Sequence, residues 1–188
     1  MMPTDSFEAA ATQRWVKQFA VDMNLCPFAG REVRSARVRY VVSGATGLEN
    51  LLHSLHVECE LLVEDEKIAT TLLIHPHCLQ SFDDYLDGLQ VAEALLDSLG
   101  LIGVLQIAGF HPDYQFAGSS PDAVENYTNR TPYPTLHILR EDAMERAIQA
   151  HGATEDIPLR NIDHLRSLGL TQVKRLREAC FTGSVDAS

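Results

Sequence analysis

"LENLLHSLHVECELLVEDEKIATTLLIHP", residues 48–76, contains the two patterns that decide the fold. Apolar residues recur at intervals of three and four positions from Leu48 to Leu62, which places them on one face of a helix. "ATTLLIHP" at 69–76 then gathers β-branched and apolar residues before a proline, a pattern typical of a buried strand. An amphipathic helix that leads into a buried strand predicts an α/β unit.

The neighbouring segments continue this alternation on both sides. "RVRYVV" at 37–42 predicts a strand before the helix, and residues 81–100 predict a second amphipathic helix that begins at a capping pair, Ser81 and Asp84. "GVLQIAGF" at 103–110 predicts a third strand. Strands that alternate with long helices are joined by right-handed crossovers, so we expect a largely parallel sheet.

The rest of the chain completes one domain. A helix is expected from about residue 6 to residue 23, and "TLHILR" at 135–140 predicts a fourth strand that two further helices follow. We therefore expect an α/β fold, a single domain with a sheet of about four mostly parallel strands flanked by helices. This domain covers residues 1–180, and residues 181–188 are predicted to form a flexible tail.

Composition and charge exclude several classes of partner. Fifteen Lys and Arg against 26 Asp and Glu give a net charge of -11, which repels nucleic-acid phosphates and anionic lipids. No apolar run is long enough to span a bilayer, and the N-terminal segment lacks the basic-then-apolar order of a signal peptide. We expect a cytoplasmic protein that binds neither nucleic acid nor membrane, and the sequence leaves its oligomeric state open.

The four cysteines are scattered, without a C-x-x-C pair, and are expected to be reduced thiols. Cys59 lies on the apolar face of its helix and is predicted to be a core residue. Cys26 precedes Pro27 at a predicted chain reversal, where it could expose a reactive thiol or anchor the turn. We predict the structural role for Cys26.

Two His-Pro corners point to a site at one edge of the sheet. "HPH" at 75–77 and "HPD" at 111–113 end two strands, and the ends of parallel strands meet at the edge where α/β proteins bind ligands. Each histidine could instead only fill a turn that the proline ends. Residues 115–134 show little periodicity but contain three aromatic residues, so we expect an ordered binding loop there.

The second corner carries groups that could transfer protons. His111, Asp113 and Tyr114 lie within four positions, and we predict catalytic roles for them. His75, His111 and Asp113 could also hold a divalent metal ion, since imidazole and carboxylate suit iron, zinc or manganese. No two of these ligands share a helix face, so such a site depends on the geometry of the predicted sheet.

A second group of polar residues suggests a small anionic ligand. The guanidinium groups of Arg130 and Arg140 can grip a carboxylate or phosphate, and amides and phenols can complete the hydrogen bonding. The predicted substrate-binding residues are Asn126, Asn129, Arg130, Tyr133, His137 and Arg140. We expect most of these residues to surround one pocket with His111 and Asp113.

Three segments resemble those of a known family. They are "NLCPFA" at 24–29, "GFHPDYQFAG" at 109–118 and "NYTNRTPYPTLHILRE" at 126–141, in this order and with similar intervening lengths. On these segments the chain resembles the bacterial domain of unknown function 1415 family, from Trp15 to about Gly169. The resemblance implies a single-domain cytoplasmic bacterial protein, and it implies no activity.

Two classes of function agree with these observations. The first is a small-molecule enzyme that acts on an anionic substrate, with His111 as general acid–base or metal ligand. The second is a non-catalytic ligand-binding or regulatory domain that uses the same pocket. The proton-transfer groups beside the third strand favour the enzyme, because a simple binder does not need them. A structural module that packs its polar loop on a partner chain is a third alternative.

Overall fold

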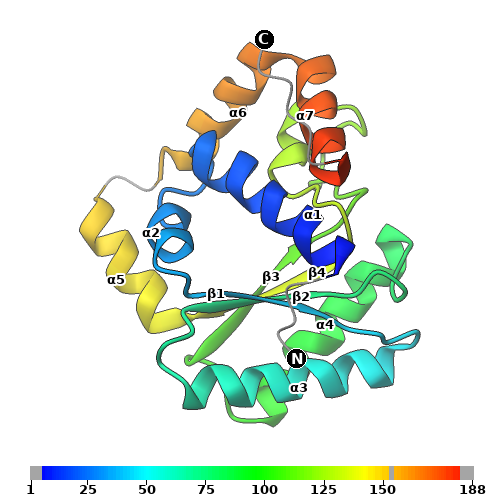
Figure 1. The fold of residues 1–188 in the computed structure, drawn as a ribbon, viewed down its shortest axis with the longest axis vertical. Coiled ribbons are helices and arrows are strands. Elements are labelled where there is room, and N and C mark those ends of the chain that lie inside the picture. Colours follow the sequence, from blue (N-terminus) through cyan, green and yellow to red (C-terminus); the bar gives the residue numbers. More distant parts are fainter. Residues whose placement is uncertain (1–5, 153–154, 183–188) are drawn as a thin grey trace.

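The structure, a computed structural model, describes residues 6–152 and 155–182. Its helices and strands, labelled in Figure 1, are α1 (Phe7–Trp15), the π-helix η1 (Val16–Asp22), α2 (Ala29–Arg34), β1 (Val38–Val42), α3 (Leu48–Glu64), β2 (Thr70–Ile74), α4 (Phe82–Ser98), β3 (Leu105–Phe110), the 3-10 helix η2 (Val124–Thr128), β4 (Thr135–Arg140), α5 (Glu141–His151), α6 (Ile157–Leu168) and α7 (Leu170–Thr182). The predicted tail overlaps the end of α7 at 181–182, and its remainder, residues 183–188, lies outside the described residues.

The four strands form one mixed sheet in the order β1-β2-β4-β3. The α/β class is confirmed, but the prediction of a mostly parallel sheet is wrong, because β4 is antiparallel to both of its neighbours. The connection through residues 111–134 leaves and re-enters the sheet at the same edge, and it pairs Phe110 with Thr135. A chain that returns to the edge it left must run back in the opposite direction.

The first three strands nevertheless share one direction. β1 and β2 pair in parallel, and β3 points the same way as β2 because both are antiparallel to β4. Ser43, His75 and His111, which follow these strands, therefore emerge at the same edge of the sheet. This edge is called the carboxyl edge below.

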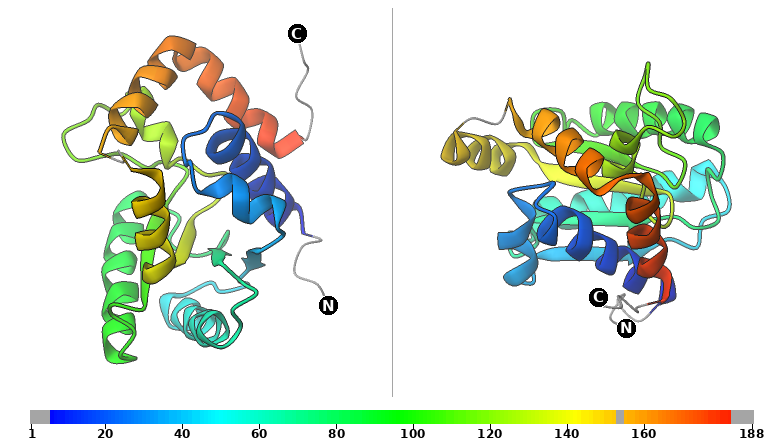
Figure 2. Two further views of the ribbon diagram at one scale, coloured as in Figure 1. Left: turned by 90° about the vertical axis from the view of Figure 1, so that its left-hand side faces the viewer. Right: turned by 90° about the horizontal axis from the view of Figure 1, so that it is seen from above.

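Helices cover both faces of the sheet, as Figures 1 and 2 show. α3 and α4 pack on one face around a core that includes Leu73 and Ile138, while α1, η1 and α7 pack on the other face with Leu72 and Ile74. The alternation along β2 explains this division, since successive side chains of a strand point to opposite faces. No helix in the described ranges is both long and apolar enough to cross a membrane.

The hydroxyl of Tyr85 fastens α4 to the sheet. It accepts a hydrogen bond from the Phe110 amide at 2.8 Å and donates one to the Thr135 carbonyl at 2.9 Å, so it bridges β3 and β4 where their paired segment ends. Gly109 makes this approach possible, because a Cβ at that position would lie 2.9 Å from the Tyr85 hydroxyl oxygen. Tyr85 itself is fully buried.

We predict that Tyr85→Phe lowers the free energy of unfolding by about 2 kcal/mol, because it leaves a buried donor and a buried acceptor without a partner. Chemical denaturation of the variant and of the wild type measures this loss. Tyr114→Phe is the matched control, since the Tyr114 hydroxyl makes no hydrogen bond in the described part of the chain. Equal stability of the Tyr85 and Tyr114 variants would contradict the bridging role.

Candidate functional site

Two buried histidines flank Tyr85 at the carboxyl edge. The ring centroids of His75 and Tyr85 are 5.9 Å apart with nearly parallel planes, and those of Tyr85 and His111 are 5.0 Å apart. The sequence prediction that both His-Pro corners reach one edge of the sheet is therefore met. Both imidazole rings face α4. Side chains alternate between the two faces of the sheet along β2 and β3, and His75 and His111 continue this alternation on the α4 side.

Both ring nitrogens of His111 bind backbone groups. Nδ1 accepts a hydrogen bond from the Asp113 amide at 3.0 Å, so the proton lies on Nε2, which donates to the Leu79 carbonyl at 3.2 Å. Burial lowers the pKa of His111, so the ring stays neutral at physiological pH. With both nitrogens occupied, the predicted acid–base role would require one of these bonds to break.

His75 has the opposite tautomer and one unused nitrogen. Its Nδ1 lies 2.9 Å from the Cys78 carbonyl, which can only accept, so Nδ1 carries the proton. Nε2 is buried and has no hydrogen-bond partner among the described residues. Burial lowers the pKa of His75 to about 4, which keeps the imidazole neutral and its Nε2 lone pair free.

Asp113 and Tyr114 lie beside His111 at the start of the long loop. The Asp113 side chain is exposed, and it forms no ion pair within the described ranges. The Tyr114 ring contacts Phe82 and Phe116, with centroids 5.2 and 5.0 Å away, and burial raises the pKa of its hydroxyl. The three residues of the predicted catalytic set are thus adjacent in space, and the described residues offer no hydrogen-bond partner to the Asp113 carboxylate or the Tyr114 hydroxyl.

The amides and the arginine of the loop hold the loop together. Asn126 is fully buried, and its side chain binds backbone groups of Phe116 and Ser120. Asn129 donates to the Gly109 carbonyl at 3.0 Å. Arg130 donates to the carbonyls of Tyr114 and Pro121, both at 2.9 Å, and its guanidinium lies over the Tyr127 ring. These side chains pair with backbone carbonyls and amides of the irregular loop, which has no regular secondary structure to pair them over most of its length.

Arg177 of α7 also holds the loop, and the sequence analysis missed it. Its guanidinium donates to the carbonyls of Arg130 and Thr131 at 3.2 and 2.9 Å, and it interacts with the charge of Asp113. Burial lowers the pKa of Arg177. Helical periodicity shows that α7 has a polar face but not which loop that face meets, so the sequence carried no signal for this contact.

Two of the predicted substrate-binding residues, Tyr133 and His137, lie away from the His111 ring. Tyr133 contacts Phe181 on the face that α1 and α7 cover, with ring centroids 5.8 Å apart. His137 lies on that same face, where burial lowers its pKa to about 4. The Thr70 hydroxyl donates its proton to the Ile138 carbonyl, so His137 Nε2, 2.7 Å from the Thr70 oxygen, is the donor to it. Since β4 alternates its side chains, His137 cannot share a pocket with a ring on the α4 face.

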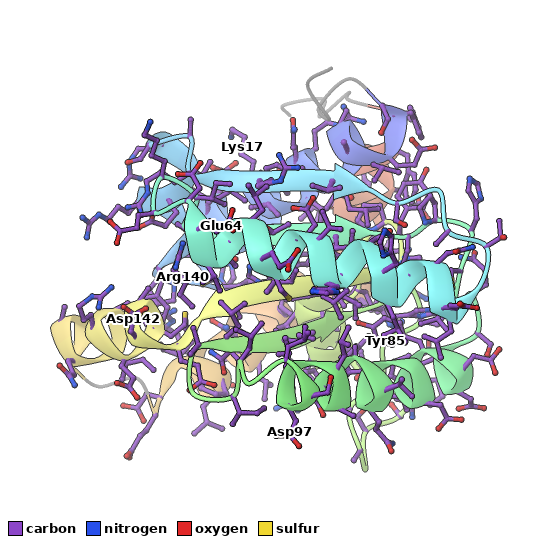
Figure 3. The ribbon with its side chains drawn as sticks, turned by 90° about the horizontal axis from the view of Figure 1, so that it is seen from below. Lys17, Glu64, Tyr85, Asp97, Arg140 and Asp142 are labelled. Atoms are coloured by element: carbon purple, nitrogen blue, oxygen red, sulfur yellow. The ribbon has the colours of Figure 1, made fainter. Side chains whose placement is uncertain are left out.

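Arg140 lies at the opposite end of the sheet from Tyr85, as Figure 3 shows. It donates to the carbonyls of Leu62, Ile68 and Asp65, the last at 3.1 Å. It therefore caps the carboxyl end of α3, where a positive charge is favourable. The structure does not bring Arg130 and Arg140 together around one anion.

The predicted metal ligands do not converge either. Across residues 6–152 and 155–182, no group of three or more His, Cys, Asp or Glu side chains could hold a metal ion. His111 uses both ring nitrogens for backbone groups, and Asp113 points to solvent. Two ligand groups of the predicted set have no hydrogen-bond partner among the described residues: His75 Nε2, which is enclosed, and the Asp113 carboxylate, which is exposed.

A cavity of about 350 Å³ opens at the carboxyl edge, between α3 and α4. It is lined by residues 46–48, by Cys78 and Leu79, and by α4 side chains that include Asp84 and Asp87. The first turn of α3 begins at Gly47, which makes no side-chain cap bond, so amide donors of this turn are available beside the cavity. Cys78 is almost fully buried, and burial raises the pKa of its thiol.

Gly88 allows Leu79 to pack closely against α4 beside this cavity. A Cβ at Gly88 would overlap the Leu79 side chain, and Leu79 has a left-handed backbone with φ of 54°. Leu79 thus inserts against α4 while its carbonyl binds His111. A glycine within an otherwise good helix-forming segment was the sequence signal for this close approach, and the sequence analysis did not use it.

Comparison with known proteins assigns no activity to this arrangement. A family model with the description "Protein of unknown function (DUF1415)" matches residues 8–175. No curated protein and no solved structure matches the chain.

We predict that Arg177→Ala releases the loop from α7. The carbonyls of Arg130 and Thr131 lose their donors, so the free energy of unfolding should fall by about 1–3 kcal/mol. Hydrogen exchange of the backbone amides should accelerate at residues 126–131. Arg175→Ala, an exposed arginine of the same helix, is the matched control and should leave both quantities unchanged. Identical exchange in the two variants would show that α7 does not hold the loop.

Proposed function

This chain belongs to the domain of unknown function 1415 family, and from that premise we propose that it is a small-molecule-binding protein whose ligand occupies the cavity between α3 and α4. The position of this cavity carries the proposal. It opens at the carboxyl ends of β1 and β2, where their connections to α3 and α4 diverge, and ligands of α/β proteins bind at such places.

The charges around the cavity favour a ligand with a cationic group. Asp84 and Asp87 line it, and neither forms an ion pair within the described ranges. The apolar side chains of Leu79 and Val91 offer contact to a short carbon skeleton. The open amides of the first α3 turn suit a carboxylate or another acceptor on the same ligand. A small amine, and above all an amine that also carries a carboxylate, fits this combination.

A purely anionic ligand finds less support. That expectation rested on Arg130 and Arg140, whose guanidinium groups bind backbone carbonyls at different ends of the molecule. The charged side chains at the cavity are carboxylates instead. An anion would be repelled by Asp84 and Asp87 unless it also carried a positive charge.

Binding without turnover is the better supported of the two functional classes. An enzyme built on His111 needs a nitrogen that can exchange a proton with the substrate, and both His111 nitrogens bind backbone groups. The free Nε2 of His75 is enclosed by the core. The proposal also includes a cytoplasmic location. All four cysteines are free thiols, which is usual for proteins kept in a reducing compartment.

The test measures the thermal stability of the protein with small primary amines, amino acids and carboxylates of matched size. We expect an amino acid or amine to raise the unfolding temperature, because a ligand that binds only the folded state stabilises it. Asp87→Asn should weaken the affinity for that compound about tenfold, since it removes one charge from the cavity.

Asp97→Asn is the matched control, because Asp97 is an exposed aspartate of the same helix that does not line the cavity. It should leave the affinity unchanged. The proposal fails if the carboxylates bind better than the amines, if no compound of the panel stabilises the protein, or if both variants weaken binding equally.

A further inference from the structure

Leu79 has a backbone conformation that leucine seldom adopts. Its φ of 54° lies in the left-handed region, where the Cβ crowds a neighbouring carbonyl. Asn24 and Ala36, the other described non-glycine residues with positive φ, follow the ends of η1 and α2, where this conformation is common. Leu79 instead lies between β2 and α4 and lines the cavity, so neighbouring contacts must hold it in this conformation.

Two buried imidazoles hold the carbonyls on either side of this strained torsion. The Cys78 carbonyl lies 2.9 Å from Nδ1 of His75, and the Leu79 carbonyl lies 3.2 Å from Nε2 of His111. Both rings are fully buried, so each fixes the direction of the carbonyl that it binds. The φ torsion of Leu79 lies between the two carbonyls. A large change of φ therefore turns one carbonyl relative to the other and breaks at least one of these hydrogen bonds.

The Leu79 side chain fills the space that Gly88 leaves on α4. A Cβ at Gly88 would overlap Cδ1 of Leu79 and would lie 3.1 Å from its Cδ2. Both residues line the cavity of about 350 Å³, so the cavity is the open space next to this side chain. A Leu79 side chain that left the space at Gly88 would enter the cavity, because the core on its other side is closely packed.

His111 connects Leu79 to the long loop, residues 111–134. Its Nδ1 accepts a hydrogen bond from the Asp113 amide at 3.0 Å, and its own amide donates to the Asn129 carbonyl at 3.1 Å. If the Leu79 carbonyl moves away, the buried Nε2 of His111 loses its acceptor, which is costly. The start of the loop is then held less firmly, because the ring that anchors it has lost one of its two hydrogen bonds.

We propose that Leu79 couples the filling of the cavity to the order of the long loop. The coupling rests on the proposed function, since the group that fills the cavity is the ligand. In one state Leu79 is inserted at Gly88 and its carbonyl holds His111. In the other state its side chain occupies the cavity and its carbonyl has left His111. A ligand binds only the first state, so it orders the start of the loop, and by linkage an ordered loop favours the ligand.

Backbone hydrogen exchange of the full chain, resolved by NMR, tests this coupling without a ligand. Gly88→Ala places a Cβ against Leu79 and should accelerate exchange of the His111 and Asp113 amides at least about fivefold. In a Leu79→Ala background the same substitution meets none of the displaced side-chain atoms and should add no acceleration. Amides of α1, on the opposite face of the sheet, should keep their rates, which excludes a general loss of stability.

A second pair of variants fills the cavity instead of displacing Leu79. Val91 lines the cavity, so Val91→Phe should slow exchange of the same two amides. Val57→Phe is the matched control and should leave them unchanged, because Val57 is a similarly exposed valine of α3 that does not line the cavity. Any amine or amino acid that raises the unfolding temperature should also slow these amides.

Three results would overturn the coupling. They are unchanged exchange in Gly88→Ala, an equal acceleration by Gly88→Ala when Leu79 is already alanine, and exchange that Val91→Phe does not slow. A panel of compounds without a binder would instead reject the proposed function, and it would leave the coupling standing, because all of these variants act without a ligand.

Discussion

The carboxyl edge of this protein depends on one hydroxyl group, that of Tyr85. It bridges β3 and β4 at the point where the chain leaves and re-enters the sheet, and it can do so only because position 109 lacks a Cβ. The Tyr85 ring then separates two buried imidazoles, those of His75 and His111. Through this contact α4 is hydrogen-bonded to both strands at the points where the long loop begins and ends.

The polar residues near this edge show how a long irregular loop can be kept in order. The buried part of such a loop needs partners for its backbone groups, and Asn126, Arg130 and Arg177 supply them here. Side chains that satisfy backbone groups in this way have few free donors or acceptors for a ligand. Asp84 and Asp87 differ from them, since they line the cavity between α3 and α4 and form no ion pair in the described part of the chain.

Periodicity in the sequence was sufficient to locate the strands and the long helices, because burial imposes it directly on residues such as Leu51 and Leu73. It could not give the direction of β4, since an alternating pattern is the same when it is read in either direction. The hydrogen-bond partners of Arg140 could not be predicted either, because they depend on the end of the sheet at which β4 terminates, and this follows from the strand direction. Residue type alone suggested an anion site, but in the structure the guanidinium groups of Arg130 and Arg140 donate hydrogen bonds to backbone carbonyls.

Both histidines of the carboxyl edge pack against Tyr85 as neutral rings whose backbone hydrogen bonds fix opposite tautomers. Nitrogen-15 NMR of the imidazole rings during a pH titration tests this arrangement most directly. We expect a proton on Nδ1 of His75 and on Nε2 of His111, with His75 remaining neutral until the pH approaches its pKa of about 4. A common tautomer for the two rings, or titration of His75 near the ordinary histidine pKa of about 6.5, would contradict it.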